Sequence, residues 1–249
     1  MDRIEKAVAK ILAPRLAEHG YVLHPDWGSF VRRQSYGFDA FVVANQGSAS
    51  REYFAMEAYC QVRHDCIEAP WNAFGFIHGE ENRQQTWTVM LSRRRNAPAL
   101  AVRPATMAVD VAAVAEQLLA YFNAQALPFH RQFASLGAVE AMANHLPMAR
   151  PQQLEPLSVG GPTDHQAMRS LLLAKAVNPA RYAAVRQAFI DSPRQTLLPR
   201  ERCLRMVDEI DTMPDGFASD RAPAVPAMAS RGYAPAGLAV PTRVGIDLP

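Results

Sequence analysis

Two cysteines and a histidine lie close together in the stretch MEAYCQVRHDC, which runs from Met56 to Cys66. Thiolates and imidazoles are side chains that bind zinc in proteins, and they also serve as nucleophile and base in thiol enzymes. The remaining cysteine, Cys203, is far along the chain. Cys60, His64 and Cys66 are therefore the first candidates for chemistry, and the element that carries them decides which chemistry they can do.

The residues around Cys60 alternate between apolar and polar types, which predicts a β-strand with one face on a core and a wetter opposite face. Successive side chains of a strand point to opposite faces, so Cys60, His64 and Cys66 are predicted to share the inward face. Small residues packed on a buried strand are the simplest interpretation of all three. The apolar residues of that face are Phe54, Met56, Ala58, Cys60 and Val62.

A metal ion shared by the two cysteines is incompatible with a straight strand. The rise of a strand, about 3.3 Å per residue, would place Cys60 and Cys66 about 20 Å apart, whereas zinc-bound sulfurs lie about 2.3 Å from the metal. Only a sharp bend near Arg63–Asp65 would restore a shared site. We therefore predict no metal site and no cofactor.

A pair of one base and one nucleophile is the other chemistry open to this stretch. On a strand, the Cα atoms of His64 and Cys66 would be about 6.6 Å apart, which allows their side chains to touch. Catalytic pairs of this kind usually include a third, orienting group, and the neighbouring Asp65 would point to the opposite face. A thiol- and imidazole-dependent enzyme that uses Cys66 and His64 is therefore kept as an alternative function.

Aromatic residues follow this stretch in WNAFGFIHG, which is predicted to be a loop. Aromatic side chains often anchor protein interfaces, so Trp71, Phe74 and Phe76 are candidate residues for binding another protein. A lid over the hydrophobic core is the alternative interpretation of the same residues.

A run of three arginines, Arg93, Arg94 and Arg95, is the densest group of positive charge in the chain. With the nearby aromatic residues it could bind single-stranded nucleic acid through phosphate contacts and stacking. A solvated strand end or loop tip explains the same run. The formal net charge of +2 does not by itself indicate a nucleic-acid or membrane partner, so nucleic-acid binding is the third function considered.

An antiparallel sheet of about four strands is predicted to position these residues, with the first helix and a later one covering its apolar face. Residues 2–19 have the apolar spacing of a helix, in which Pro14 is expected to cause a kink or a division. Two short strands are predicted, one on each side of a turn near Ser35–Gly37. The stretch TWTVML, over Thr86–Leu91, predicts another strand after the one that contains Cys60.

The second half of the chain is predicted to be helical. One helix is expected to start at Asp110, as its N-cap, and to end at Pro128. Further helices are predicted over residues 135–145, 164–176, 179–190 and 199–212. The fold class is therefore α+β, with a domain over 1–146, a linker over 147–163, a helical segment over 164–213 and a Pro/Ala-rich tail over 214–249 that is expected to be disordered.

The composition indicates a globular protein, because apolar residues make up 49% and charged residues 20% of the chain. An odd number of cysteines does not suggest a disulfide framework, which favours a reducing compartment. The N-terminal stretch lacks the features of a secretory signal, and no apolar run reaches the ~18 residues that span a bilayer. We therefore predict a cytoplasmic protein without a membrane partner. The phosphate-loop, dinucleotide-binding and nucleophile-elbow motifs do not occur in the sequence.

Three short motifs follow one another along residues 4–145. Gly20–Tyr21 follows the first helix, Phe30–Arg32 opens the strands, and Leu127–Phe129 with Ser135 belongs to the closing helical part. This order resembles the bacterial domain-of-unknown-function family numbered 4304. The resemblance implies an α+β fold, and because that family has no assigned activity it implies no catalytic residue. Because the candidate residues do not converge on one site and the aromatic residues from Trp71 to Phe76 could anchor an interface, we favour a non-enzymatic protein-interaction domain, of the immunity or accessory type, whose partner is another protein.

Overall fold

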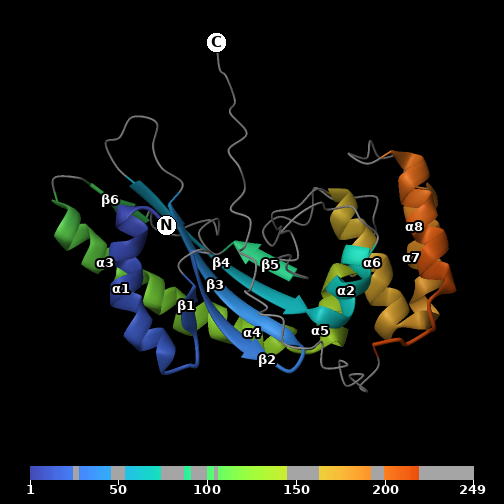
Figure 1. Ribbon diagram of the computed structural model, residues 1–249, viewed down its shortest axis with the longest axis horizontal. Helices are drawn as coiled ribbons and strands as arrows, with labels where there is room; N and C mark the ends of the chain where they lie inside the picture. The colour runs from blue at the N-terminus through green and yellow to red at the C-terminus, as the bar shows by residue number, and fades with distance from the viewer. Residues whose placement is uncertain are drawn as a thin grey trace, which may run out of the picture.

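The computed structural model describes residues 1–24, 28–45, 54–73, 87–90, 100–103, 106–144, 163–191 and 199–218. Within these ranges an antiparallel β-sheet forms the centre of the molecule. Figure 1 shows α1 (Arg3–Ala17) and α3 (Met107–Tyr121) at one end of the sheet. At the other end lie α6 (Thr163–Val177), α7 (Pro179–Asp191) and α8 (Arg200–Thr212). The predicted α+β class is confirmed.

Six strands form the sheet in the described part of the chain, where the sequence predicted about four. They run in the order β1-β2-β3-β4-β5, and β6 pairs with the beginning of β4, ahead of β5. The strands β1 and β6 have only three residues each, which is too short for an alternating pattern to be recognised. The strands are β1 (Val22–His24), β2 (Ser29–Gln34), β3 (Gly37–Asn45), β4 (Phe54–His64), β5 (Trp87–Met90) and β6 (Leu100–Val102).

Both faces of the sheet are buried in its centre. Met56, Ala58, Cys60 and Val62 point into the main hydrophobic core, as predicted. The prediction that the opposite face is wetter is wrong, because β3 is buried on both of its faces and the alternation of β4 says nothing about the strands beside it. The second face carries a separate buried cluster of Val31, Phe38, Ala40, Val42, Ala44 and Tyr59.

Helix α1 (Arg3–Ala17) contributes to the main core on the inward face of the sheet. Asp2 caps its first turn by accepting hydrogen bonds from backbone N–H groups. The helix is not divided at Pro14, although proline removes one hydrogen bond of the helix. Leu12 and Leu16 are fully buried on either side of the proline, so packing holds the helical turn in place.

A long helical stretch follows β6 and contradicts two predicted boundaries. The predicted N-cap Asp110 already lies inside the helix, where its carboxylate accepts hydrogen bonds from the N–H of Arg103 and the hydroxyl of Thr106. Pro128 does not end the stretch, since it lies at the start of a new helix, where a missing N–H costs little. The three parts are α3 (Met107–Tyr121), the π-helical turn η3 (Phe122–Ala126) and α4 (Leu127–Phe133).

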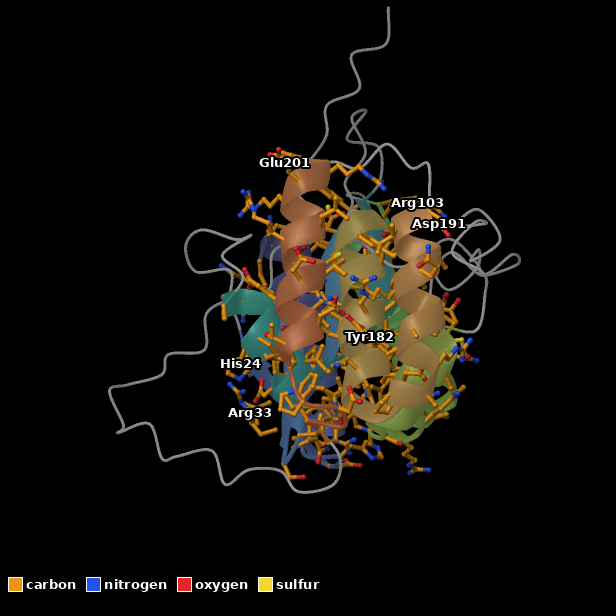
Figure 2. All side chains as sticks on the ribbon, turned by 90° about the vertical axis from the view of Figure 1, so that its right-hand side faces the viewer. His24, Arg33, Arg103, Tyr182, Asp191 and Glu201 are labelled. Atoms are coloured by element: carbon orange, nitrogen blue, oxygen red, sulfur yellow. The ribbon has the colours of Figure 1, made fainter. Side chains whose placement is uncertain are left out.

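The C-terminal helices confirm the elements predicted there, and Figure 2 shows α6 between α7 and α8. They share one hydrophobic core with the sheet, to which α6 contributes Met168 and Leu171. The division into a domain and a helical segment stays a prediction, and the linker lies outside the described residues except at its last position. Of the predicted tail, residues through 218 are described, and Asp215 pairs with Lys175 at 2.7 Å. These helices are α5 (Leu136–Ala143), α6 (Thr163–Val177), α7 (Pro179–Asp191) and α8 (Arg200–Thr212).

Candidate functional site

The strand that contains Cys60 ends before it reaches Cys66. Strand β4 stops at His64, and helix α2 (Asp65–Ala73) begins at the next residue. Cys60 is fully buried in the core, but Cys66 lies in the first turn of the helix, so the prediction of one shared strand face is wrong for Cys66. The bend that a metal site would need is present. Among the described residues, however, no group of three or more His, Cys, Asp or Glu side chains is placed to hold a metal ion.

His64 connects β4 to two other parts of the fold. Its Nε2 donates a hydrogen bond to the carbonyl oxygen of Phe133 at 2.8 Å, and its ring stacks on Tyr36 with 4.8 Å between the centroids. Burial lowers the pKa of His64 below its ordinary value, so the imidazole is neutral at pH 7. His64 therefore serves as a packed ring that joins β4, α4 and the turn after β2.

Cys66 is half-buried against the main core. Burial raises the pKa of the Cys66 thiol above its ordinary value. A nucleophilic cysteine needs a lowered pKa, because the thiolate is the reactive form. The environment of Cys66 therefore does not favour the enzyme hypothesis with His64, which stays a prediction.

Trp71 lies in α2 rather than in a loop, and its side chain is fully buried. The guanidinium carbon of Arg169 is 4.6 Å from the centre of its ring. The same guanidinium donates hydrogen bonds to both carboxylate oxygens of Glu68, at 3.0 and 2.9 Å. In this fold Trp71 is part of the core. The other candidate binding residues, Phe74, Phe76, Arg93, Arg94 and Arg95, lie outside the described residues.

A buried carboxylate that the sequence analysis missed organises the turn between β2 and β3. Asp39 is fully buried. Its Oδ2 accepts hydrogen bonds from Nε and Nη2 of Arg32, at 3.1 and 2.8 Å, and from Nε2 of Gln34 at 3.1 Å. Its Oδ1 accepts a hydrogen bond of 2.6 Å from the hydroxyl of Tyr36. We call Arg32, Gln34 and Tyr36, held by Asp39, the turn site.

Strand register brings these side chains to one face. Arg32 is the direct cross-strand partner of Asp39 in the antiparallel pair, and Gln34 is two residues further along β2. The chain then reverses, and Tyr36 reaches back to the same carboxylate. Burial and the hydrogen bond to Asp39 raise the pKa of Tyr36, so its hydroxyl keeps the proton that it donates.

Gly37 fixes the turn against the end of β4. Its φ of +146° is a conformation that other residues rarely adopt, and a Cβ there would lie 2.3 Å from the carbonyl oxygen of Arg63. The N–H of Asp65 donates a hydrogen bond of 2.8 Å to the carbonyl of Tyr36. The turn is therefore held by the first residue of α2 as well as by its own hairpin.

A second buried polar pair lies beside the turn site. The guanidinium carbon of Arg32 is 4.9 Å from the centre of the Tyr21 ring, and the Tyr21 hydroxyl is 2.6 Å from Nδ1 of His130. Nε2 of His130 is 3.2 Å from the carbonyl oxygen of Ala40, which can only accept, so Nε2 carries the proton and Nδ1 accepts from Tyr21. Burial lowers the pKa of His130 to about 4, and the ring is neutral at pH 7.

The turn site is where this buried polar network reaches the surface. The Arg32 side chain is 26% exposed, Gln34 and Tyr36 are half-buried, and Ser35 at the tip is exposed. Figure 2 shows the neighbouring Arg33 at the lower edge of the molecule, far from Glu201 on α8. One signal in the sequence pointed here, since Asp39 is the only charge in the apolar run GFDAFVVAN, and a charge inside a buried strand needs a partner.

Comparison of the chain with protein-family models, with curated proteins and with solved structures gives no match. The resemblance to the family numbered 4304 therefore stays a prediction from short motifs. None of the helices in the described ranges combines the length and the apolar character that crossing a membrane requires.

Proposed function

We propose that this chain is a non-enzymatic, cytoplasmic protein-interaction domain of the bacterial accessory or immunity type, and that it binds its partner protein through the turn site. One observation carries this proposal: the fully buried carboxylate of Asp39 holds three side chains that remain partly exposed. Burying a charge is costly unless it is well paired. Here the pairing fixes the geometry of a surface.

The residue types of the turn site suit a protein partner. Tyrosine and arginine are enriched among the residues that contribute most to protein–protein binding energy. Tyr36 is held on two sides, by its hydroxyl on Asp39 and by its ring on His64. Side chains that are already fixed lose less conformational entropy when a partner binds, which increases affinity.

The two buried histidines support a non-enzymatic role through the contacts that they make. His130 and His64 are both neutral and hydrogen-bonded to backbone carbonyls of other elements. No disulfide joins Cys60, Cys66 and Cys203, which fits a reducing compartment such as the cytoplasm.

Site-specific photo-crosslinking in the native host tests this proposal. A benzophenone amino acid replaces the exposed Ser35, and a matched probe replaces the exposed Arg205 on α8 as a remote control. We expect a discrete protein adduct from position 35 that does not form from position 205. The adduct should disappear when Tyr36→Ala is added, because the aromatic anchor is then lost, while circular dichroism shows a folded chain.

Three results would overturn the proposal: no adduct at position 35, the same adducts at both positions, or an adduct that persists in the folded Tyr36→Ala variant. Should Tyr36→Ala not fold, Ser35→Trp provides the second comparison, since it adds bulk at the exposed tip without removing a side chain that binds Asp39. This variant should block capture by a probe placed at Arg33.

A further inference from the structure

We infer that the turn site receives a carboxylate of its protein partner, from an aspartate or glutamate side chain, on the solvent-facing edge of the Arg32 guanidinium. This inference rests on the proposed function and adds the chemistry of the partner to it.

The guanidinium of Arg32 is fixed on one edge by Asp39, and the side chain is still 26% exposed. Its Nε and Nη2 donate to Asp39, and its carbon lies 4.9 Å from the centre of the Tyr21 ring. In the part of the chain that is described, no acceptor is hydrogen-bonded to its Nη1. Arginine has five N–H donors in a rigid planar fork, so a guanidinium held by one carboxylate can still bind a second one.

Exposure separates the two charges of this ion pair. The Arg32 side chain is 26% exposed, whereas the Asp39 side chain is 0% exposed. A partner that approaches the turn therefore contacts the guanidinium and not the carboxylate that neutralises it. A hydrogen bond between ionised groups is stronger than one between neutral groups, so an acidic side chain is the best complement to this edge.

The other charges near the turn also favour an acidic partner. Arg33 is exposed on the opposite face of the hairpin, and its guanidinium lies 5.6 Å from the Phe38 ring centre. Asp65 donates its backbone N–H to the carbonyl of Tyr36, and its exposed carboxylate is already paired with Arg63 at 2.6 Å. The tip of the hairpin therefore presents positive charge to a partner.

A matched pair of charge variants at Ser35 tests the inference. Ser35 is exposed and lies between Gln34 and Tyr36, so a change there alters charge without removing a partner of Asp39. The partner protein identified by crosslinking is purified and titrated against wild type, Ser35→Lys and Ser35→Glu, with Arg205→Glu as the remote control. We expect Ser35→Lys to lower the Kd about 3-fold and Ser35→Glu to raise it about 3-fold. This is the effect of one added charge that acts on an acidic partner through partly hydrated surroundings.

The salt dependence and the partner complete the test. Binding should weaken between 50 mM and 500 mM salt, because exposed charge pairs are screened. Changing the acidic residues of the crosslinked partner peptide to their amides should remove the difference between the two Ser35 variants. Arg205→Glu should change the Kd by less than about 2-fold.

Two results would contradict the inference and distinguish it from the proposed function. Equal weakening of binding by Ser35→Lys and Ser35→Glu would show that the partner uses this surface without a preference for acidic side chains. The proposed function would then stand, and the inferred partner carboxylate would be ruled out. An unchanged Kd in both variants would show that the partner does not bind at the turn site, and it would overturn the proposed function together with the inference. An adduct at position 35 that nuclease treatment destroys would identify nucleic acid as the ligand and overturn both.

Discussion

At the scale of single residues, the buried polar side chains are explained by the partners that they meet. Four donors from Arg32, Gln34 and Tyr36 replace water around the carboxylate of Asp39. A buried charge is tolerated only with such partners. His130 is buried in its neutral form, with Nδ1 bonded to the Tyr21 hydroxyl and Nε2 to the carbonyl of Ala40.

Removing the charge of Asp39 should destabilise the protein strongly. Asp39→Asn leaves the guanidinium of Arg32 without its carboxylate, and we expect a loss of about 3 kcal/mol in the free energy of unfolding. Asp211→Asn is the matched control, because Asp211 is also paired with an arginine, but the Asp211 side chain is 34% and the Arg186 side chain 32% exposed. The control should lose less than about 1 kcal/mol. Urea denaturation followed by circular dichroism measures both, and equal losses would contradict the role given to burial.

Acid should destabilise the fold through His130. The pKa of His130 is lowered to about 4 in the folded chain, from an ordinary value of 6.5. The folded state therefore prefers the neutral ring, and its contribution is complete above pH 6.5 and is lost as the pH falls toward 4. The shift corresponds to about 3 kcal/mol.

The comparison with His130→Gln isolates this contribution, since His64, whose pKa is also lowered, is common to both proteins. We expect the stability advantage of the wild type over His130→Gln to be about 3 kcal/mol larger at pH 7 than at pH 4. Urea denaturation at a series of pH values provides the test. An advantage that is the same at both ends would show that His130 does not titrate as proposed.

At the scale of elements, the turn between β2 and β3 depends on its approach to the end of β4. The backbone N–H of Asp65 is bonded to Tyr36, and Gly37 lies against the carbonyl of Arg63. This contact places Tyr36 over His64 and sets the position of the turn site. A turn held only by its own hairpin would leave these side chains free to move.

Substitution of Gly37 should therefore be far more harmful than substitution of another glycine. Gly37→Ala brings a Cβ to 2.3 Å from the Arg63 carbonyl oxygen, at a φ that alanine avoids. We expect a loss of more than about 2 kcal/mol. Gly137→Ala is the control, since its Cβ would meet only the Ser135 hydroxyl at 3.7 Å and alanine favours helix α5. Thermal denaturation should show Gly137→Ala at or slightly above wild type, and equal Tm losses in the two variants would be inconsistent with the contact.

At the scale of the whole molecule, one ion pair joins the region that contains the sheet to the C-terminal helices. Glu68 of α2 is fully buried, and Arg169 of α6 covers Trp71 while it binds this carboxylate. Figure 1 shows α2 next to α6, at the end of the sheet. The shared hydrophobic core extends across the same boundary. We therefore expect the two parts to unfold together.

The ion pair between α2 and α6 can be tested with a double-mutant cycle. Glu68→Leu and Arg169→Met should each cost about 3 kcal/mol, because each leaves one charge of the pair buried without its counter-charge. The double variant Glu68→Leu with Arg169→Met should recover most of that loss, since an apolar pair needs no counter-charge. Urea denaturation followed by both tryptophan fluorescence and circular dichroism checks the free energies and the single transition. Additive losses, or two separate transitions, would contradict the proposed coupling.

The sequence by itself determined the elements whose patterns are long and regular. The alternation around Cys60 and the helical spacing of residues 2–19 and 164–212 predicted a strand and helices that the structure confirms. Local patterns also located the turn near Ser35–Gly37, because short polar residues and glycine interrupt two apolar strands. These features depend on neighbours along the chain.

Only the tertiary structure decided where those elements end and which side chains meet. Packing of Leu12 and Leu16 kept α1 intact through Pro14, and a helix begins at Asp65 where the strand pattern continued to Cys66. The turn site required the register of β2 and β3. No local pattern reports such contacts, because the free energy that selects them comes from burial between distant segments.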